Sequence, residues 1–223
     1  MPVCFKKNWK DGTEVLVWKI IEDEHFFLAE LNSYPFIIQD LEKIRYSSKR
    51  RQYLASRYLL KSLLGVKAFC KLKKTKRGKI YLPGDHLKLS LSHSASYAAV
   101  VVSLVDVGVD IQEFDQRLLT LSRKFVNENE FGYIDKGNPL LDYHLIWGAK
   151  ESIFKAWGKG GLDFKKNMEI SSPENNMSGE FQRFGRLEKG RQCRDYEIWN
   201  DIGDSIFLVV AREINRNITE SNN

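Results

Sequence analysis

The sequence predicts a mixed α+β protein with two similar lobes, residues 1–106 and 107–223, related by a pseudo-two-fold axis. Three observations lead to this prediction. Each half combines one long helical pattern with several strand-like patterns. The second half echoes the first. The chain has 223 residues, of which 43% are hydrophobic, and a chain of this length can bury a substantial core.

In the first lobe, one long helix is expected among several strands. Residues 14–21 are β-branched and aromatic, as in a strand, and residues 22–31 follow as one or two helical turns. Residues 47–64 have apolar side chains at helical spacing, with Ser47 or Ser48 as the expected cap and Gly65 as the stop. The other elements expected in this lobe are a basic loop or hairpin at 71–79 and two strands at 87–91 and 97–104, and a further short strand at 107–111 opens the second lobe.

The second lobe is expected to repeat this plan. A strong helical pattern runs from about residue 141 to residue 157, and Gly158 ends it. The other elements expected here are a short helix and the two strands of a hairpin: 128–134, 195–200 and 205–213, with a turn at 201–204.

The two halves can be compared directly. Ala55 and Lys61 bracket a Leu-Leu pair in the first long helix, just as Ala149 and Lys155 bracket an Ile-Phe pair in the second. Two strand segments also correspond: SYAAVV at 96–101 and SIFLVV at 205–210. Such an echo is either a coincidence or the trace of two similar lobes. In the second case, the ligand cleft is expected between the lobes.

Composition narrows the class of protein. The net charge of +6 favours an acidic partner, a phosphate-rich ligand or nucleic acid, with a generally basic surface as the plain alternative. Three scattered cysteines without a CxxC pair are typical of reduced thiols, not of a disulfide framework or zinc site. No signal-peptide pattern and no membrane-spanning run is present, so we expect a cytoplasmic protein.

Two segments of the second half carry carboxylates suited to metal binding. Asp110 ends a strand pattern just after Gly108, and a glycine there lets a backbone or a phosphate approach closely. On the long helix, Glu151 and Lys155 share a face. A simple turn and a surface ion pair are the plain alternatives. Against them, this helix is unusually apolar, and charges near a protein interior need partners such as a metal or phosphates.

A third segment, Ser92-His93-Ser94, lies at the expected end of a strand. A histidine flanked by serines can offer several hydrogen-bond donors to a phosphate. For a lone histidine, a satisfied turn residue is the more frequent interpretation.

Together these segments resemble the signature of the Sfp-type 4′-phosphopantetheinyl transferase superfamily. Its members typically show Ser-His-Ser, then Gly-[Ile/Val]-Asp-x-Glu, then Trp-x-x-Lys-Glu-[Ala/Ser]-x-x-Lys. The matching residues here are 92–94, 108–112 and 147–155, and residues 124–131 resemble the family's Phe-x-x-x-x-Glu stretch. The resemblance covers about residues 51–161 and implies the two-lobed fold of that family, with the metal site in the second lobe.

The resemblance also implies an activity. Such an enzyme, a holo-[acyl-carrier-protein] synthase, transfers the 4′-phosphopantetheine group of coenzyme A to a serine of an apo acyl or peptidyl carrier protein and releases 3′,5′-ADP. Mg²⁺ is the implied cofactor, with Mn²⁺ as a substitute, and coenzyme A is the co-substrate. We expect a monomer that binds neither nucleic acid nor membrane. The pathway, whether fatty acid, polyketide or nonribosomal peptide, stays open.

The resemblance assigns roles to matching residues. The implied metal ligands are Asp110, Gln112 and Glu151. The implied catalytic residues are Glu151, Lys155 and, as an outer candidate, Glu130. The residues expected to bind coenzyme A are Arg51, Lys79, Ser92, His93, Lys150 and Lys155.

The chain departs from the family pattern at two positions. Gln112 stands where the family has a glutamate, and the adjacent Glu113 would point to the opposite face of a strand. Mg²⁺ often binds through one or two carboxylates together with waters and substrate phosphates, so Gln112 bears on the affinity and identity of the metal more than on the reaction. Ile80 replaces the proline of a Gly-Lys-Pro-like segment.

Three other functions stay open. The first is a degenerate relative that binds coenzyme A without transfer, the second is a metal-dependent nuclease, and the third is a purely structural or protein-interaction module. Separated acidic residues, lysines and a basic surface fit a nuclease, but the Ser-His-Ser segment would then be unexplained.

Overall fold

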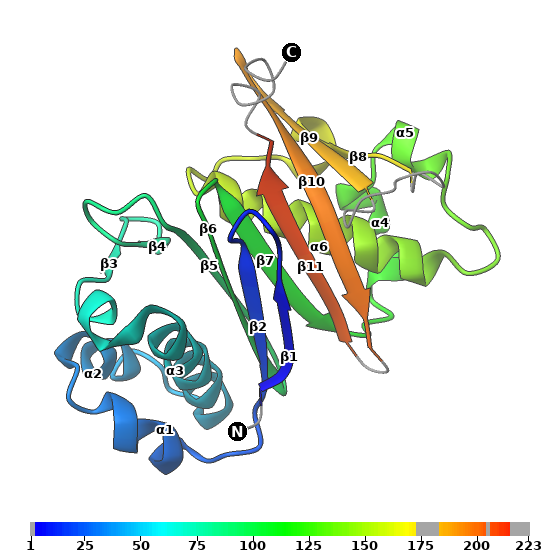
Figure 1. The fold of residues 1–223 in the computed structure, drawn as a ribbon. Coiled ribbons are helices and arrows are strands. Elements are labelled where there is room, and N and C mark those ends of the chain that lie inside the picture. The colour runs from blue at the N-terminus through cyan, green and yellow to red at the C-terminus, as the bar shows by residue number, and fades with distance from the viewer. Residues whose placement is uncertain (1–2, 173–182, 204–205, 215–223) are drawn as a thin grey trace. The chain divides into compact units, whose positions relative to one another are not determined.

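The computed structural model describes residues 3–172, 183–203 and 206–214. The chain divides into two compact units, Met1–Leu104 and Val105–Asn223. Each unit combines helices with an antiparallel sheet (Figure 1). The predicted α+β class is therefore confirmed, and the pseudo-two-fold relation between the lobes stays a prediction.

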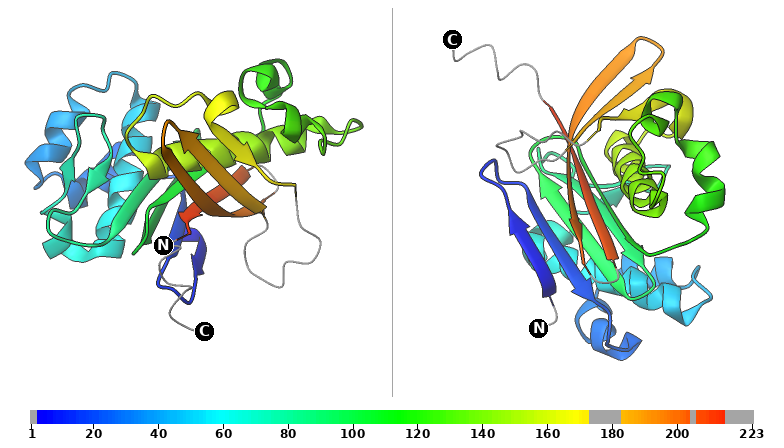
Figure 2. Two further views of the ribbon diagram at one scale, coloured as in Figure 1. Left: turned by 90° about the horizontal axis from the view of Figure 1, so that it is seen from above. Right: turned by 90° about the vertical axis from the view of Figure 1, so that its right-hand side faces the viewer.

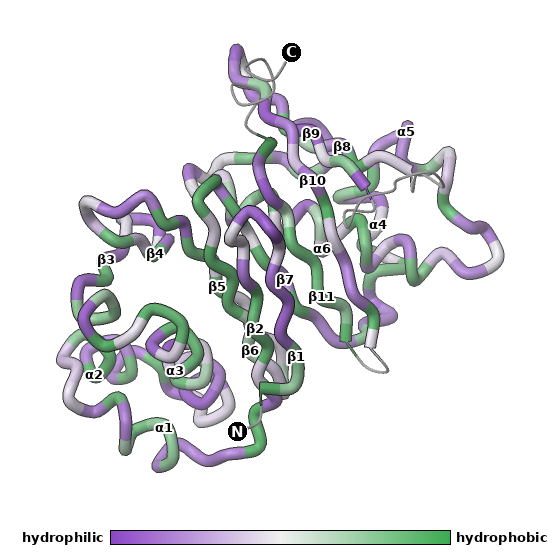
Figure 3. Tube along the Cα trace, in the orientation of Figure 1, coloured by the Kyte–Doolittle hydropathy of each residue, from purple (hydrophilic) through white to green (hydrophobic). Residues whose placement is uncertain are grey.

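The sheet of the first unit has four strands: β1 (Val3–Asn8), β2 (Glu14–Lys19), β5 (Lys88–Ser94) and β6 (Tyr97–Ser103). Their order is β1-β2-β6-β5. The inner strand β6 is buried almost throughout, as its apolar sequence predicts. A separate hairpin pairs β3 (Lys73–Lys74) with β4 (Ile80–Tyr81), and Figure 3 shows both hydrophilic and hydrophobic segments in this region.

Three helices complete the first unit: α1 (Glu24–Leu31), α2 (Pro35–Leu41) and α3 (Ser47–Phe69). Helix α3 packs on β2, β5 and β6, and the two shorter helices pack against α3. The core of this unit therefore lies between α3 and one face of the sheet, and it includes Trp18, Phe27 and Leu54.

The sheet of the second unit has five strands: β7 (Val107–Glu113), β8 (Met168–Ile170), β9 (Arg183–Lys189), β10 (Gln192–Ile202) and β11 (Ile206–Glu213). Their order is β7-β11-β10-β9-β8. The helices are α4 (Leu118–Phe125), α5 (Glu128–Phe131), α6 (Pro139–Trp157) and α7 (Phe164–Asn167). Helix α6 runs along one face of this sheet and contacts β7 and β11 most extensively (Figure 2).

Several expected boundaries were wrong. Helix α3 begins at Ser47 itself, after the extended residue Tyr46, so neither Ser47 nor Ser48 is its cap. Gly65 leaves the helical conformation with φ of 72°, yet a further turn continues to Phe69. The helix expected at 128–134 is the single turn of α5. The hairpin of β10 and β11 is confirmed, and Asp204 of its expected turn lies outside the described residues.

Two further sequence inferences concern the whole chain. Within the described residues, no helix is long and apolar enough to cross a membrane. Cys4, Cys70 and Cys193 are exposed free thiols, as their spacing predicts.

Candidate active site

Two glycines let helix α6 lie directly on strand β7. A Cβ added at Gly108 would lie 1.8 Å from the backbone oxygen of Ser152, and one added at Gly148 would lie 2.8 Å from Nε2 of Gln112. A methyl group at Gly108 would meet backbone, and one at Gly148 would require the side chains of Val209 and Gln112 to shift. The glycine before Asp110 therefore serves the close approach of a backbone, which is one of the two uses predicted for it.

This close contact brings three of the predicted site residues together. Asp110 on β7 is 7% exposed, and the Lys155 ammonium on α6 donates to Asp110 Oδ1 at 2.7 Å and to Val109 O at 3.0 Å. Burial raises the pKa of Glu151, the negative charge of Asp110 raises it further, and Lys155 opposes both. Two carboxylates and one ammonium thus share a single region of the second unit.

Gln112 lies two positions beyond Asp110 on β7, so the two side chains face the same way, toward α6. Its Nε2 donates to the backbone oxygen of His144 on α6 at 2.9 Å. The same strand and helix therefore hold all three predicted metal ligands.

The donor chemistry fits Mg²⁺, which prefers oxygen ligands and often uses one or two carboxylates with waters and phosphates. Within the described part of the chain, no group of three His, Cys, Asp or Glu side chains is arranged to hold a metal ion. The available set is two carboxylates and one amide oxygen, so substrate phosphates would have to complete the coordination.

Lys150 and Glu130 are placed in the protein interior. Both side chains are fully buried, and the Lys150 ammonium donates to Glu130 Oε2 at 2.7 Å and to the backbone oxygens of Phe125 at 2.7 Å and Phe164 at 3.0 Å. Burial lowers the pKa of Lys150, and Glu130 opposes this change. Three acceptors use all three protons of the ammonium, which favours a structural role for Lys150, and its predicted contact with coenzyme A stays a prediction.

Both carboxylate oxygens of Glu130 also accept hydrogen bonds from the backbone. Its Oε1 accepts from the backbone nitrogen of Ile170 at 2.9 Å, and its Oε2 accepts from that of Asn127 at 2.8 Å. The latter bond and the Asn127 side chain form a capping box at the start of α5. Glu130 therefore has a structural role in this unit, and its predicted catalytic role stays a prediction.

The other residues predicted to bind coenzyme A belong to the first unit. On β5, Ser92 is buried and His93 is exposed, as the alternation of a strand requires. Gln52 on α3 donates to the backbone oxygen of Ala95 at 3.3 Å, so the start of α3 lies beside the turn that follows the Ser-His-Ser segment. Arg51, next to Gln52, has a buried Nε for which the described residues supply no acceptor.

Lys79 lies between β3 and β4, and its backbone nitrogen donates to Thr75 Oγ1 at 3.2 Å. The hairpin contacts β5 through β4, which places Lys79 on the element next to the strand that carries Ser92 and His93.

Residues 106–201 match the family model described as the 4′-phosphopantetheinyl transferase superfamily. The second unit carries a 4′-phosphopantetheinyl transferase superfamily domain. Two curated proteins bear the same activity in their names. The chain is 26% identical over 121 residues to the 4′-phosphopantetheinyl transferase gsp of Aneurinibacillus migulanus, covering 53% of this chain and 51% of that protein.

The second relative is a 4′-phosphopantetheinyl transferase of Bacillus subtilis. It is 28% identical over 87 residues, which cover 37% of this chain and 39% of that protein. The chain thus spans about half of the first relative's length and less of the second's.

The transferase-superfamily domain holds one residue that the sequence did not single out. His144 on α6 is fully buried, its Nε2 accepts from the backbone nitrogen of Asp115 at 3.0 Å, and its ring stacks on Phe207 at 4.3 Å. Burial lowers the pKa of His144. Its position on the helix, one turn before Gly148, was the available signal, because residues four apart share a face.

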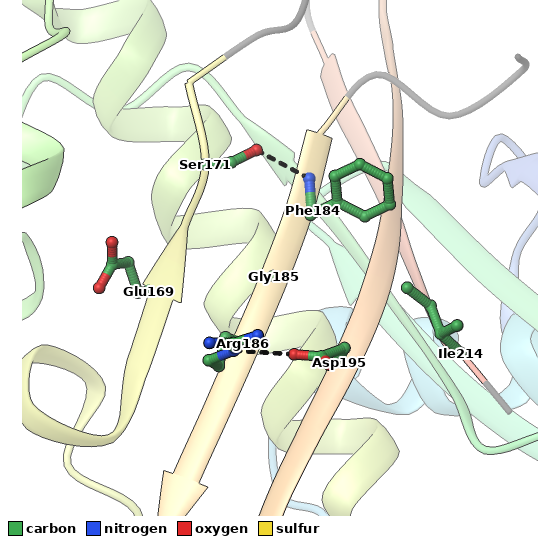
Figure 4. A pocket seen from close by; sticks show the side chains of 7 residues that line it. All are labelled: Glu169, Ser171, Phe184, Gly185, Arg186, Asp195 and Ile214. Atoms are coloured by element: carbon green, nitrogen blue, oxygen red, sulfur yellow. Dashed lines mark hydrogen bonds and ion pairs between the residues drawn. The ribbon is translucent and has the colours of Figure 1, made fainter. Parts of the chain in front are cut away.

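A cavity lies elsewhere in the transferase-superfamily domain. It measures about 500 Å³, and Figure 4 shows its lining on β8, β9 and β10, where Arg186 pairs with Asp195 at 2.9 Å. Its lining residues are Glu169, Ser171, Phe184, Gly185, Arg186, Asp195 and Ile214. None of them is a predicted site residue.

Proposed function

We propose that this protein transfers the 4′-phosphopantetheine group of coenzyme A to a serine of an apo acyl or peptidyl carrier protein, with release of 3′,5′-ADP. The observation that carries the proposal is the meeting of Asp110, Glu151 and Lys155 where α6 lies on β7, within the segment that matches the transferase superfamily. Both relatives named above are phosphopantetheinyl transferases by name.

Asp110, Gln112 and Glu151 would hold Mg²⁺, or Mn²⁺ in its place. When bound, the ion would neutralise charge on the pyrophosphate of coenzyme A, and such neutralisation together with positioning accounts for most of the catalysis of phosphoryl transfer. With only two carboxylates in the set, the protein would depend on the pyrophosphate for further oxygen ligands.

Lys155 is the cation nearest to the reaction in this proposal. Its ammonium already lies 2.7 Å from Asp110 Oδ1, at the edge of the metal-ligand group and partly exposed. It would donate to the pyrophosphate and stabilise the negative charge that develops as the bond to 3′,5′-ADP breaks.

Glu151 would accept the proton of the carrier serine hydroxyl. Burial and Asp110 raise its pKa, and a carboxylate with a raised pKa is a stronger base than an exposed one. The proton would pass to a Glu151 carboxylate oxygen while the serine oxygen bonds to the β-phosphorus.

Arg51, Lys79, Ser92 and His93 would bind the anionic nucleotide part of coenzyme A. The buried Arg51 Nε without an acceptor favours a bound anion, since a buried donor costs free energy until it is paired. We propose that the protein is a cytoplasmic monomer that binds the carrier protein and coenzyme A and binds neither nucleic acid nor membranes.

The test is release of 3′,5′-ADP, followed by chromatography. We expect release only when coenzyme A, Mg²⁺ and an apo carrier protein are all present, with acyl and peptidyl carriers tried separately. Tight binding of coenzyme A without release from either carrier would instead identify a degenerate binder. Cleavage of DNA without release would identify a nuclease.

A further inference from the structure

Gln112 is held in one orientation by the backbone of α6. Its Nε2 donates to the backbone oxygen of His144 at 2.9 Å, and the missing side chain of Gly148 makes this contact possible, because a Cβ there would lie 2.8 Å from the same nitrogen. The nitrogen and oxygen of a planar amide lie on opposite arms. Fixing Nε2 on the helix therefore turns Oε1 away from the helix carbonyl.

Phe207 neighbours both the donor residue and the acceptor residue of this hydrogen bond. The His144 ring stacks on Phe207 at 4.3 Å with 5° between the ring planes. Phe207 is also the cross-strand partner of Gln112 in the pairing of β7 with β11. His144, which accepts the hydrogen bond, therefore packs on Phe207, and Phe207 lies beside Gln112, which donates it. Packing on a common neighbour holds both residues in place.

We propose that position 112 is built for an amide and determines the charge of the metal site. Gln112 gives its nitrogen to His144 and offers Oε1 as a neutral ligand beside Asp110 and Glu151. This inference rests on the proposed function for the identity of the site, but not for the orientation of the amide. It makes Gln112 a required part of this helix–strand contact and not the remnant of a lost carboxylate.

A glutamate at position 112 could not donate this hydrogen bond to His144. An ionised carboxylate only accepts hydrogen bonds, so its oxygen near the His144 oxygen would face another acceptor across about the same distance. The side chain would have to leave the helix or keep this repulsion. Restoring the family's acid is therefore expected to disturb the protein before any metal is added.

The neutral ligand also changes how the metal is held. Asp110, Glu151 and Lys155 together carry one net negative charge, and Gln112 adds none. We expect weak binding of Mn²⁺ to the protein alone and tighter binding once the phosphates of coenzyme A are present.

The orientation is tested on the metal-free wild-type protein by NMR. The side-chain NH₂ signals of Gln112 are assigned by their loss in Gln112→Met, and their exchange with water is compared with that of the exposed Gln192. A hydrogen bond of ordinary strength slows exchange by about tenfold. Exchange as fast as that of Gln192 would overturn the inference, even if the protein proved to be an active transferase.

The charge argument is tested with Gln112→Glu beside Gln112→Met in EDTA. We expect Gln112→Glu to melt at a lower temperature than Gln112→Met, although glutamate is closer in shape to glutamine. Equal or higher stability of Gln112→Glu would overturn the inference.

Metal binding is then followed by electron paramagnetic resonance of Mn²⁺, with and without coenzyme A. Tightening by coenzyme A of about tenfold or more is expected for the wild type, and an unchanged affinity would contradict the neutral-ligand account. Slow amide exchange in a protein that transfers nothing would leave the orientation standing and reject the proposed function alone.

Discussion

The fold changes the ionisation of Glu151, the residue proposed as the base of the reaction. Burial and Asp110 raise its pKa above the ordinary value of 4.5. This direction applies to the metal-free protein, so it is tested in EDTA. An NMR titration of the Glu151 carboxyl in EDTA should therefore place its pKa above 4.5. A pKa at or below that value would contradict the burial of Glu151 beside Asp110.

The same shift has a consequence for stability. A carboxyl whose pKa is raised in the folded state opposes folding once it is ionised, so the penalty is present above the raised pKa and absent below the unfolded value. Glu151→Gln should therefore raise the Tm in EDTA at neutral pH, with the gain shrinking toward pH 4. The exposed Glu128 supplies the control, because Glu128→Gln should leave the Tm nearly unchanged at both pH values.

Lys150 should behave as a structural residue. Lys150→Met leaves Glu130 as an unpaired buried charge, which typically costs about 3–5 kcal/mol. Urea denaturation should show this loss, and the double variant with Glu130→Gln should lose less than the two single variants added together. Full stability of Lys150→Met with a loss of coenzyme A binding alone would instead support the predicted ligand-binding role.

The sequence led to the correct neighbourhood but not to these separate roles. Lys150 and Glu151 are adjacent in the chain, and the family pattern treats them together. Successive helical residues point about 100° apart, so Glu151 shares the region of Asp110 while Lys150 enters the interior beside α4 and α5. A motif records positions in the chain, whereas the partners of a buried charge are set by tertiary packing.

At the scale of elements, the contact between α6 and β7 is the feature that builds the site. Gly108→Ala should be the more damaging change, because its Cβ would meet the rigid backbone oxygen of Ser152 at 1.8 Å. Gly148→Ala meets side chains that can move, Val209 and Gln112, so its cost should stay within about 1–3 kcal/mol.

Chemical denaturation measures both variants, and Gly137→Ala is the matched control. Its Cβ would lie 3.3 Å from a flexible Asp135 side chain, so we expect little loss of stability. Comparable stability of Gly108→Ala and Gly137→Ala would contradict the close approach of α6 to β7.

The elements that the sequence predicted best were long or fully buried. Helix α6 and strand β6 carry apolar residues over many positions, and their patterns are unambiguous. The buried residues of helix α4, Leu118, Ser122 and Phe125, follow helical spacing. The helix was missed because one of them is polar and because the exposed Leu119 and Leu121 obscure the period. Helix α2 was not expected, and it begins at Pro35, a residue that fits the first turn of a helix. Strand β8 has three residues, which is shorter than a pattern can reveal.

At the scale of the whole molecule, the net charge of +6 bears on the partner. Carrier proteins present an acidic helix beside their serine, so opposite charges should speed their encounter. We expect kcat/KM for the carrier to fall as salt rises from low ionic strength, with kcat nearly constant, because screening weakens long-range attraction. Steady-state kinetics at several NaCl concentrations measures this. A salt-independent kcat/KM would show that the basic surface does not serve the carrier.

The most direct test is the intact mass of an apo carrier protein after incubation with coenzyme A and Mg²⁺. We predict that the wild type and Glu128→Gln add one phosphopantetheine group per carrier, and that Glu151→Gln and EDTA-treated wild type add none. No addition by the wild type to either an acyl or a peptidyl carrier, with Mg²⁺ or Mn²⁺, would contradict the proposed transfer. Equal addition by Glu151→Gln would contradict the site at α6 and β7.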